Sequence, residues 1–157
     1  MATIRKASCA DLDMINRVIE RAITTWNLPD RVKRLSLSSY LYRQSDLQTM
    51  EIIVAENNDY SIAGVAAWEQ AEAKETPEGS TALLLHGIFV DPECQHQGIG
   101  KQLLRAAEHR ALERGYTVLL VKAQASAAKF FIAHGMQPVK IMNEKRDYAH
   151  RYWKQLT

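Results

Sequence analysis

Apolar residues recur along the chain with two different periods, and this predicts a mixture of helices and strands. Apolar positions three or four residues apart predict helices over residues 11–23 and 98–114 and a shorter helix over residues 126–134. Ser8 or Asp11 would cap the first of these helices. Another helical region follows Pro29, where the apolar spacing is imperfect and a break is expected.

Shorter apolar segments, bounded by turn residues, predict strands. They cover residues 4–7, 51–56, 61–68, 83–90, 116–121, 139–142 and 149–156. The sequence Asn57-Asn58-Asp59 is typical of a tight turn and predicts a hairpin. Residues 116–121 are almost continuously apolar, as in a strand buried on both faces of a parallel sheet. The order of elements therefore predicts an α/β fold with a mixed, partly parallel sheet flanked by helices.

The composition is that of one folded domain over residues 1–157. Of the 157 residues, 46% are hydrophobic and 24% charged, which excludes a disordered chain and a disulfide-built miniprotein. The net charge of +2 predicts no nucleic-acid partner. Two cysteines, Cys9 and Cys94, with no leader-like N-terminus and no long apolar run, predict a soluble cytoplasmic protein without a membrane partner.

The segment most informative about function joins a strand to a helix at residues 90–104. The start of a helix presents backbone N–H groups without acceptors, and the helix dipole adds positive potential there. Gly98 and Gly100 have no Cβ atom to hold an anion away from the backbone. The segment therefore predicts a binding site for a phosphate or pyrophosphate group.

Two common phosphate-binding motifs do not fit this segment. A Walker A loop would need glycine at Gln95 and a magnesium-binding hydroxyl at Gln102, so no metal site is expected. A dinucleotide fingerprint would need glycine at Leu103. The pattern that does fit is Gln/Arg-x-x-Gly-x-Gly/Ala, formed by Gln95, Gly98 and Gly100.

This motif and its surroundings resemble the GCN5-related N-acetyltransferase (GNAT) family. Val90-Asp91-Pro92 precedes the motif and Leu103-Leu104 follows it, as in that family. Residues 4–12 resemble the opening strand and helix of the family, and residues 127–136 resemble its late helix. Tyr152-Trp153-Lys154 resembles the last strand, so the resemblance covers essentially the whole chain.

The resemblance implies the acyl-CoA N-acyltransferase (GNAT) fold, in which two central parallel strands splay apart. It implies that acetyl-coenzyme A is the cofactor and that its acetyl group passes directly to a primary amine of a small molecule or peptide. Dimers are common in the family, so a homodimer is one expected assembly. The expected cofactor-binding residues are Ile88, Val90, Gln95, His96, Gln97, Gly98, Ile99, Gly100, Lys101 and Gln124.

One expected catalytic residue is missing. The family commonly has a tyrosine on the late helix that protonates the departing thiolate, but Phe131 occupies that position. Phe131 is expected to be a core residue, with Ser126, Tyr148 and Cys94 as weak replacements for the acid. A thiolate is a fairly good leaving group, so solvent is another source of the proton. The substitution also leaves an alternative function open, a catalytically silent acyl-CoA-binding or sensing domain.

For the catalytic base, His86 is the first candidate because imidazole changes its charge near neutral pH. Glu69, at the end of the preceding strand, is the second. Trp26, Tyr40 and Tyr42 lie in the region where the family usually builds its acceptor site. They are expected either to pack between helices or to line a pocket for a cationic amine.

Overall fold

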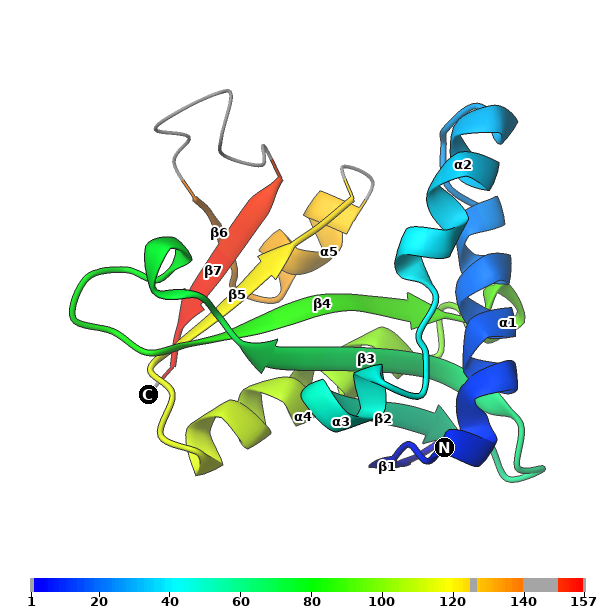
Figure 1. Ribbon diagram of the computed structural model, residues 1–157, viewed down its shortest axis with the longest axis horizontal. Helices are drawn as coiled ribbons and strands as arrows, with labels where there is room; N and C mark the ends of the chain where they lie inside the picture. Colours follow the sequence, from blue (N-terminus) through cyan, green and yellow to red (C-terminus); the bar gives the residue numbers. More distant parts are fainter. Residues whose placement is uncertain (1, 125–126, 140–149, 157) are drawn as a thin grey trace. The chain divides into compact units, whose positions relative to one another are not determined.

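The computed structural model describes residues 2–124, 127–139 and 150–156 (Figure 1). The chain forms two compact units, and each is described separately. The first unit comprises Met1–Ala67 and Ile88–Ala106, and the second comprises Trp68–Gly87 and Ala107–Thr157. No helix in the described part of the chain has the length and apolar character that crossing a membrane requires.

The first unit contains most of the N-terminal half of the chain. Its complete elements are β1 (Thr3–Lys6), η1 (Cys9–Asp11), α1 (Leu12–Thr24), α2 (Asp30–Tyr40), α3 (Asp46–Thr49), β2 (Glu51–Glu56) and η3 (Pro92–Cys94). Strand β1 pairs antiparallel with β2, from Thr3 opposite Glu56 to Lys6 opposite Ile53. The helical region after Pro29 is broken, as predicted. Helices α2 and α3 are separate, and the residues that follow them, Leu41 and Met50, have extended backbone.

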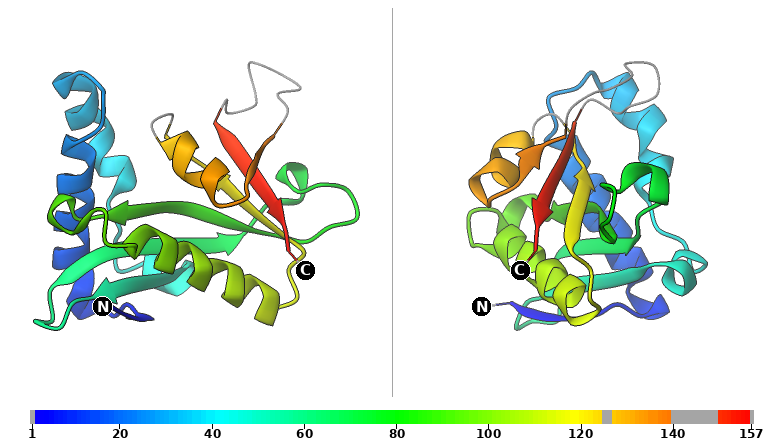
Figure 2. Two further views of the ribbon diagram at one scale, coloured as in Figure 1. Left: turned by 180° about the vertical axis from the view of Figure 1, so that it is seen from behind. Right: turned by 90° about the vertical axis from the view of Figure 1, so that its left-hand side faces the viewer.

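Helix α1 supplies much of the core of the first unit. Its buried residues recur three or four positions apart and are Ile15, Val18, Ile19, Ala22 and Ile23. They pack in one cluster with Ile52 and Val54 of β2 and with Val65 of β3 (Ile62–Gln70). Helices α1 and α2 lie side by side in all views (Figures 1 and 2). In contrast to α1, helix α2 has no buried residue.

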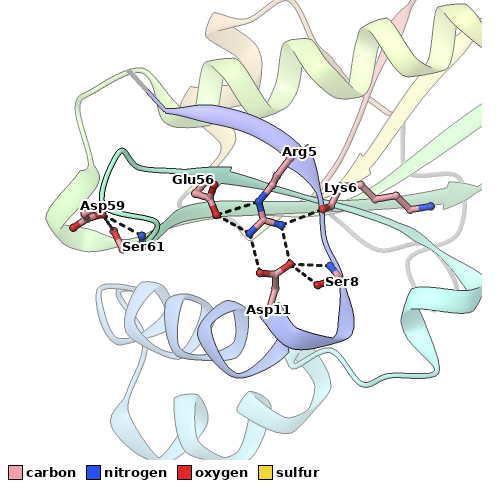
Figure 3. Close-up of polar contacts among 7 residues, drawn as sticks. All are labelled: Arg5, Lys6, Ser8, Asp11, Glu56, Asp59 and Ser61. Carbon is pink, nitrogen blue, oxygen red and sulfur yellow. Dashed lines mark hydrogen bonds and ion pairs between the residues drawn. The ribbon is translucent and has the colours of Figure 1, made fainter.

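An ion cluster joins β1, β2 and the start of α1 (Figure 3). Arg5 donates from both terminal nitrogens to the two carboxylate oxygens of Asp11 at 2.9 Å. It also donates to Glu56 Oε2 at 2.7 and 3.1 Å. Asp11 Oδ2 in turn accepts from the Ser8 backbone N–H at 2.8 Å and from the Ser8 hydroxyl at 3.1 Å. Both residues expected at the helix start therefore take part in it.

Loss of the Asp11 carboxylate is expected to destabilise the fold in a pH-dependent way. The hydrogen-bonded Arg5 guanidinium holds the pKa of Asp11 well below its usual range. A carboxyl with a lower pKa in the folded state stabilises the fold above its unfolded pKa of about 4, and this contribution is lost as the pH falls. Asp11→Asn should therefore lower the free energy of unfolding by about 2 kcal/mol near pH 7, and by less near pH 3.

Urea unfolding of both proteins at the two pH values measures this difference. Asp59→Asn is the matched control, because hydrogen bonds from Ser61, and not an ion pair, lower the pKa of Asp59 (Figure 3). Near pH 7, Asp59→Asn should lower the free energy of unfolding less than Asp11→Asn does. If Asp11→Asn lowers the free energy of unfolding equally at both pH values, the stabilising role of the ionised Asp11 carboxylate is contradicted.

The second unit contains the parallel part of the sheet. Its complete elements are η2 (Ala73–Glu75), β5 (Val118–Lys122), α5 (Ala128–Ala133), β6 (Gln137–Pro138) and β7 (Arg151–Gln155). Strand β4 (Ala82–Val90) runs parallel to β5, and β7 runs antiparallel to β5. A small apolar cluster, formed by Ala71, Ala82, Val118 and Leu120, lies in this unit.

The strand order is β1-β2-β3-β4-β5-β7-β6, and the predicted mixed, partly parallel sheet is confirmed. Several predicted strands differ from those observed by one or two residues at an end. Strand β3 continues to Gln70, two residues beyond its predicted end, so Glu69 lies within the strand. Directly before the strand expected over residues 139–142, the described part of the chain forms the two-residue strand β6, which pairs with β7. Residues 140–142 lie outside the described part.

Candidate active site

The segment after β4 is held in place by the chain on either side of it. The Asp91 backbone N–H donates to Ala63 O at 2.8 Å, and the Asp91 side chain accepts from the Glu93 N–H at 2.9 Å. Arg21 of α1 places Nη2 3.2 Å from Asp91 Oδ1. Pro92 then opens a short 3₁₀ helix, the conformation that its fixed φ favours. These contacts fix the direction in which the chain leaves the strand.

The turn that follows requires left-handed backbone conformations at two residues. His96 has φ of 65° and Gly98 has φ of 81°. Glycine adopts this conformation without the steric cost that a side chain adds. A Cβ atom at Gly98 would have no neighbour within 4 Å, so the space above this glycine is open.

Helix α4 (Ile99–Glu113) begins directly after this turn. The first hydrogen bond of the helix runs from Gln102 N–H to Gly98 O at 3.0 Å. The backbone N–H groups of Ile99, Gly100 and Lys101 consequently have no acceptor within the helix. The first turn contains no acidic residue, so nothing in it opposes the positive potential of the helix start. The predicted helix start, with its free backbone N–H groups, is present in the first unit.

A surface pocket of about 560 Å³ lies beside the helix start. Its lining residues are Ala2, Asn57, Asn58, Asp59, Gln97, Gly98, Ile99 and Gln102. Gln102 Oε1 is buried there and has no hydrogen-bond partner among the described residues. Neither Gln102 nor the hairpin residues are among the binding residues expected from the sequence. Gln102 could have been found, since it lies one helical turn from Gly98, whereas no local pattern links the hairpin to this loop.

The close approach of α4 to β3 depends on Gly64. A Cβ atom at Gly64 would lie 2.9 Å from Ile99 Cγ2, 3.0 Å from Leu103 Cδ1 and 3.0 Å from Phe89 O. Real Cβ atoms essentially never come as close as 2.9 Å to a neighbour, and the backbone oxygen of Phe89 has little freedom to move away. Gly64 thus sets how near the first turns of α4 lie to the sheet.

Strand β4 carries the residues expected to contact the cofactor arm. Ile88 and Val90 are half-buried, whereas Phe89 between them is buried, as the alternation of a strand requires. The ladder with β5 contains four pairs and ends with Leu85 opposite Val121, although β4 has nine residues. This short ladder fits the expected divergence of the two strands.

The two candidates for the catalytic base contact each other. His86 Nε2 on β4 lies 3.2 Å from Glu69 Oε2 on β3, within the second unit. The side chains are 35% and 41% exposed, so solvent can reach both. The sequence predicted the two residues only as separate candidates, because their contact depends on how β3 and β4 pair.

The remaining predicted residues differ in their surroundings. Phe131 is 3% exposed and stacks on Tyr152 with ring centroids 6.3 Å apart, so its interpretation as a core residue is confirmed. Gln124 is half-buried, and its backbone oxygen accepts from the Ala127 N–H. Cys94 Sγ lies 3.8 Å from Asn57 Nδ2. Ser126 and Tyr148 lie outside the described residues.

The aromatic residues near the acceptor region pack in the first unit. Trp26 is edge-on to Tyr40, with ring centroids 5.2 Å apart, and stacks on Phe89 at 6.2 Å. Tyr42 packs against the same core, and its burial raises the pKa of the phenol, which stays protonated. Asn16 holds the Tyr42 backbone with hydrogen bonds of 2.9 Å in both directions. This arrangement agrees with packing between helices.

Comparison with known structures gives the same fold. The PaiA N-acetyltransferase of Thermoplasma acidophilum, in complex with coenzyme A, is 16% identical with a TM-score of 0.77, and the match covers 99% of each chain. A GNAT family acetyltransferase of Brucella melitensis, in complex with acetyl-CoA, is 16% identical with a TM-score of 0.68 and covers 100% of this chain and 89% of that one. A GNAT acetyltransferase from Desulfovibrio desulfuricans is 20% identical with a TM-score of 0.72 over the whole of both chains.

Comparison of the sequence with family models identifies the family as well as the fold. No curated protein is significantly similar to the chain. The model of the acetyltransferase (GNAT) domain matches residues 48–138, which include β2 to β5, the turn at Gly98 and helix α4. This match spans more than half of the chain and agrees with the predicted resemblance. The chain therefore belongs to the GNAT acetyltransferase family.

Proposed function

We propose that this protein moves the acetyl group of acetyl-coenzyme A directly to a primary amine of a small molecule or peptide. The amine nitrogen attacks the thioester carbonyl carbon, the N–C bond forms and the C–S bond breaks. A base takes one amine proton, and the departing thiolate takes a proton from solvent, which gives an amide and the free thiol of coenzyme A. The observation that carries the proposal is the start of α4, with its open turn at Gly98.

The pyrophosphate of the cofactor would bind at this turn. Backbone N–H groups at a helix start bind phosphate oxygens, and the helix dipole favours their negative charge. The residues proposed to surround it are Gln95, His96, Gln97, Gly98, Ile99, Gly100 and Lys101. Ile88 and Val90 would bind the pantetheine arm through their backbone groups, and Gln124 would reach its amide. The solved GNAT structures that hold coenzyme A or acetyl-CoA support this choice of cofactor.

His86 is proposed as the base that takes the amine proton. It lies on the same strand as Ile88 and Val90 and is accessible to solvent. No acid on the late helix is required, because an ordinary thiol has a pKa of about 8.5 and its thiolate leaves readily. Phe131 therefore does not exclude turnover, and the reaction needs only a bound thioester, a neutral amine and an accessible base.

Thermal unfolding with acetyl-coenzyme A, beside ATP and NAD, tests the proposed cofactor. A ligand at about 100 times its Kd stabilises the folded state by roughly 2.7 kcal/mol, which raises Tm by several degrees in a chain of this size. We expect this shift with acetyl-coenzyme A alone. Thiol release in the presence of a panel of primary amines then tests transfer. Binding without release would favour the silent binding domain, and an unchanged Tm at millimolar ligand would overturn the proposal.

A further inference from the structure

We infer that Glu69 is a positioning residue that fixes the imidazole tautomer of His86 and so makes Nδ1 the atom that accepts the amine proton. This inference rests on the proposed function. It starts from the contact of 3.2 Å between Glu69 Oε2 and His86 Nε2. A carboxylate has only acceptor atoms, so it favours the neutral imidazole tautomer whose proton lies on the nearer nitrogen, Nε2. Nδ1 is then left with a free lone pair.

The placement of the pair on two strands favours this role. Side chains on neighbouring strands are held more precisely than side chains on loops. Strand β5, on the other side of β4, carries Lys122 next to the last residue of the parallel ladder. Lys122 contacts Glu75 in an ion pair, so its charge is already matched and Glu69 is not drawn away from His86 by it.

The proton transfer then runs through His86 alone. The amine proton passes to Nδ1 as the N–C bond forms, and Nε2 keeps its own proton. The resulting imidazolium has its positive charge beside the Glu69 carboxylate, which stabilises it as it forms. Glu69 takes no proton and touches no reacting atom. After the amide leaves, Nδ1 returns its proton to water.

Replacing the carboxylate by an amide tests the tautomer. In Glu69→Gln the side-chain NH₂ can donate to Nε2, which favours the tautomer with the proton on Nδ1 and removes the accepting lone pair. We expect kcat to fall about 10- to 100-fold, less than the roughly 10⁴-fold known for a buried carboxylate of this kind, because the pair is partly exposed. The KM for the amine and the Kd for acetyl-coenzyme A should stay unchanged.

The ¹⁵N signals of His86, assigned by comparison with His86→Gln, report the tautomer without any turnover. We expect a protonated Nε2 in the wild-type chain and a shift toward protonated Nδ1 in Glu69→Gln. His109 and Glu113 form the matched control, since His109 Nε2 lies 3.0 Å from Glu113 Oε1 on the surface of α4. Glu113→Gln should change neither the signals of His86 nor kcat.

The double variant Glu69→Gln/His86→Gln distinguishes positioning from an independent role. A residue that acts only through His86 adds no further loss once His86 is gone. The inference would be overturned if kcat of the double variant fell by the product of the two single-variant losses. It would also be overturned if His86 of the wild-type chain carried its proton on Nδ1. An unchanged kcat in Glu69→Gln would overturn it as well. A wild-type chain that acetylates no amine would instead overturn the proposed function, whatever tautomer the spectra show.

Discussion

Gly98→Glu is expected to weaken the binding of acetyl-coenzyme A at least about 100-fold. The substitution places a carboxylate in the open space above the turn, where the pyrophosphate is proposed to bind. Like charges brought together in a binding site cost several kcal/mol, and the bulk of the side chain also blocks access to the helix start. Isothermal titration of the purified variant with acetyl-coenzyme A measures the loss.

The backbone supplies an unusually close control for this prediction. Gly98, Gly79 and Gly115 have φ of 81°, 78° and 80°, and a Cβ atom would meet nothing within 4 Å at any of them. Gly79→Glu and Gly115→Glu therefore impose the same left-handed strain, about 1–2 kcal/mol, and the same added charge. They should bind acetyl-coenzyme A as the wild type does. The assignment of the loop would lose its basis if all three variants lost affinity for acetyl-coenzyme A equally. The same holds if a folded Gly98→Glu variant lost no affinity.

His86→Gln is expected to lower kcat about 100- to 10,000-fold, the usual contribution of a general base. Glutamine is neutral, similar in length and still able to contact Glu69, so the strand pairing should survive. The Kd for acetyl-coenzyme A should not change, because the proposed pyrophosphate site is formed by residues 95–101. Steady-state thiol release at saturating acetyl-coenzyme A, together with titration calorimetry, measures both quantities.

His109→Gln is the control for the loss of an imidazole. His109 also pairs with a glutamate, but on an exposed helix face, and its side chain is 78% exposed. We expect its kcat to stay within about twofold of the wild type, as for most surface substitutions. If His86→Gln keeps the same activity as this control, His86 is not the base, and Glu69 or a water molecule would have to take the proton.

The sequence by itself determined the parts of this protein that depend on local chemistry. The open turn before α4 was indicated by Gly98 and Gly100, two residues without a Cβ atom at the start of an amphipathic helix. The parallel pairing of β4 with β5 was indicated by the continuous apolar run of the second strand. Phe131 could be placed in the core because it lies on the buried side of a short helix.

The tertiary structure alone decided which distant segments meet. The contact of Glu69 with His86, and of Arg5 with Glu56, depends on strand pairing, which periodicity does not specify beyond the face of a strand. Gly64 could not be identified in advance, because its importance comes from Ile99 and Leu103, which pack where a Cβ atom would lie. Periodicity reports which face of an element is buried, whereas contacts between elements follow from how all of them pack together.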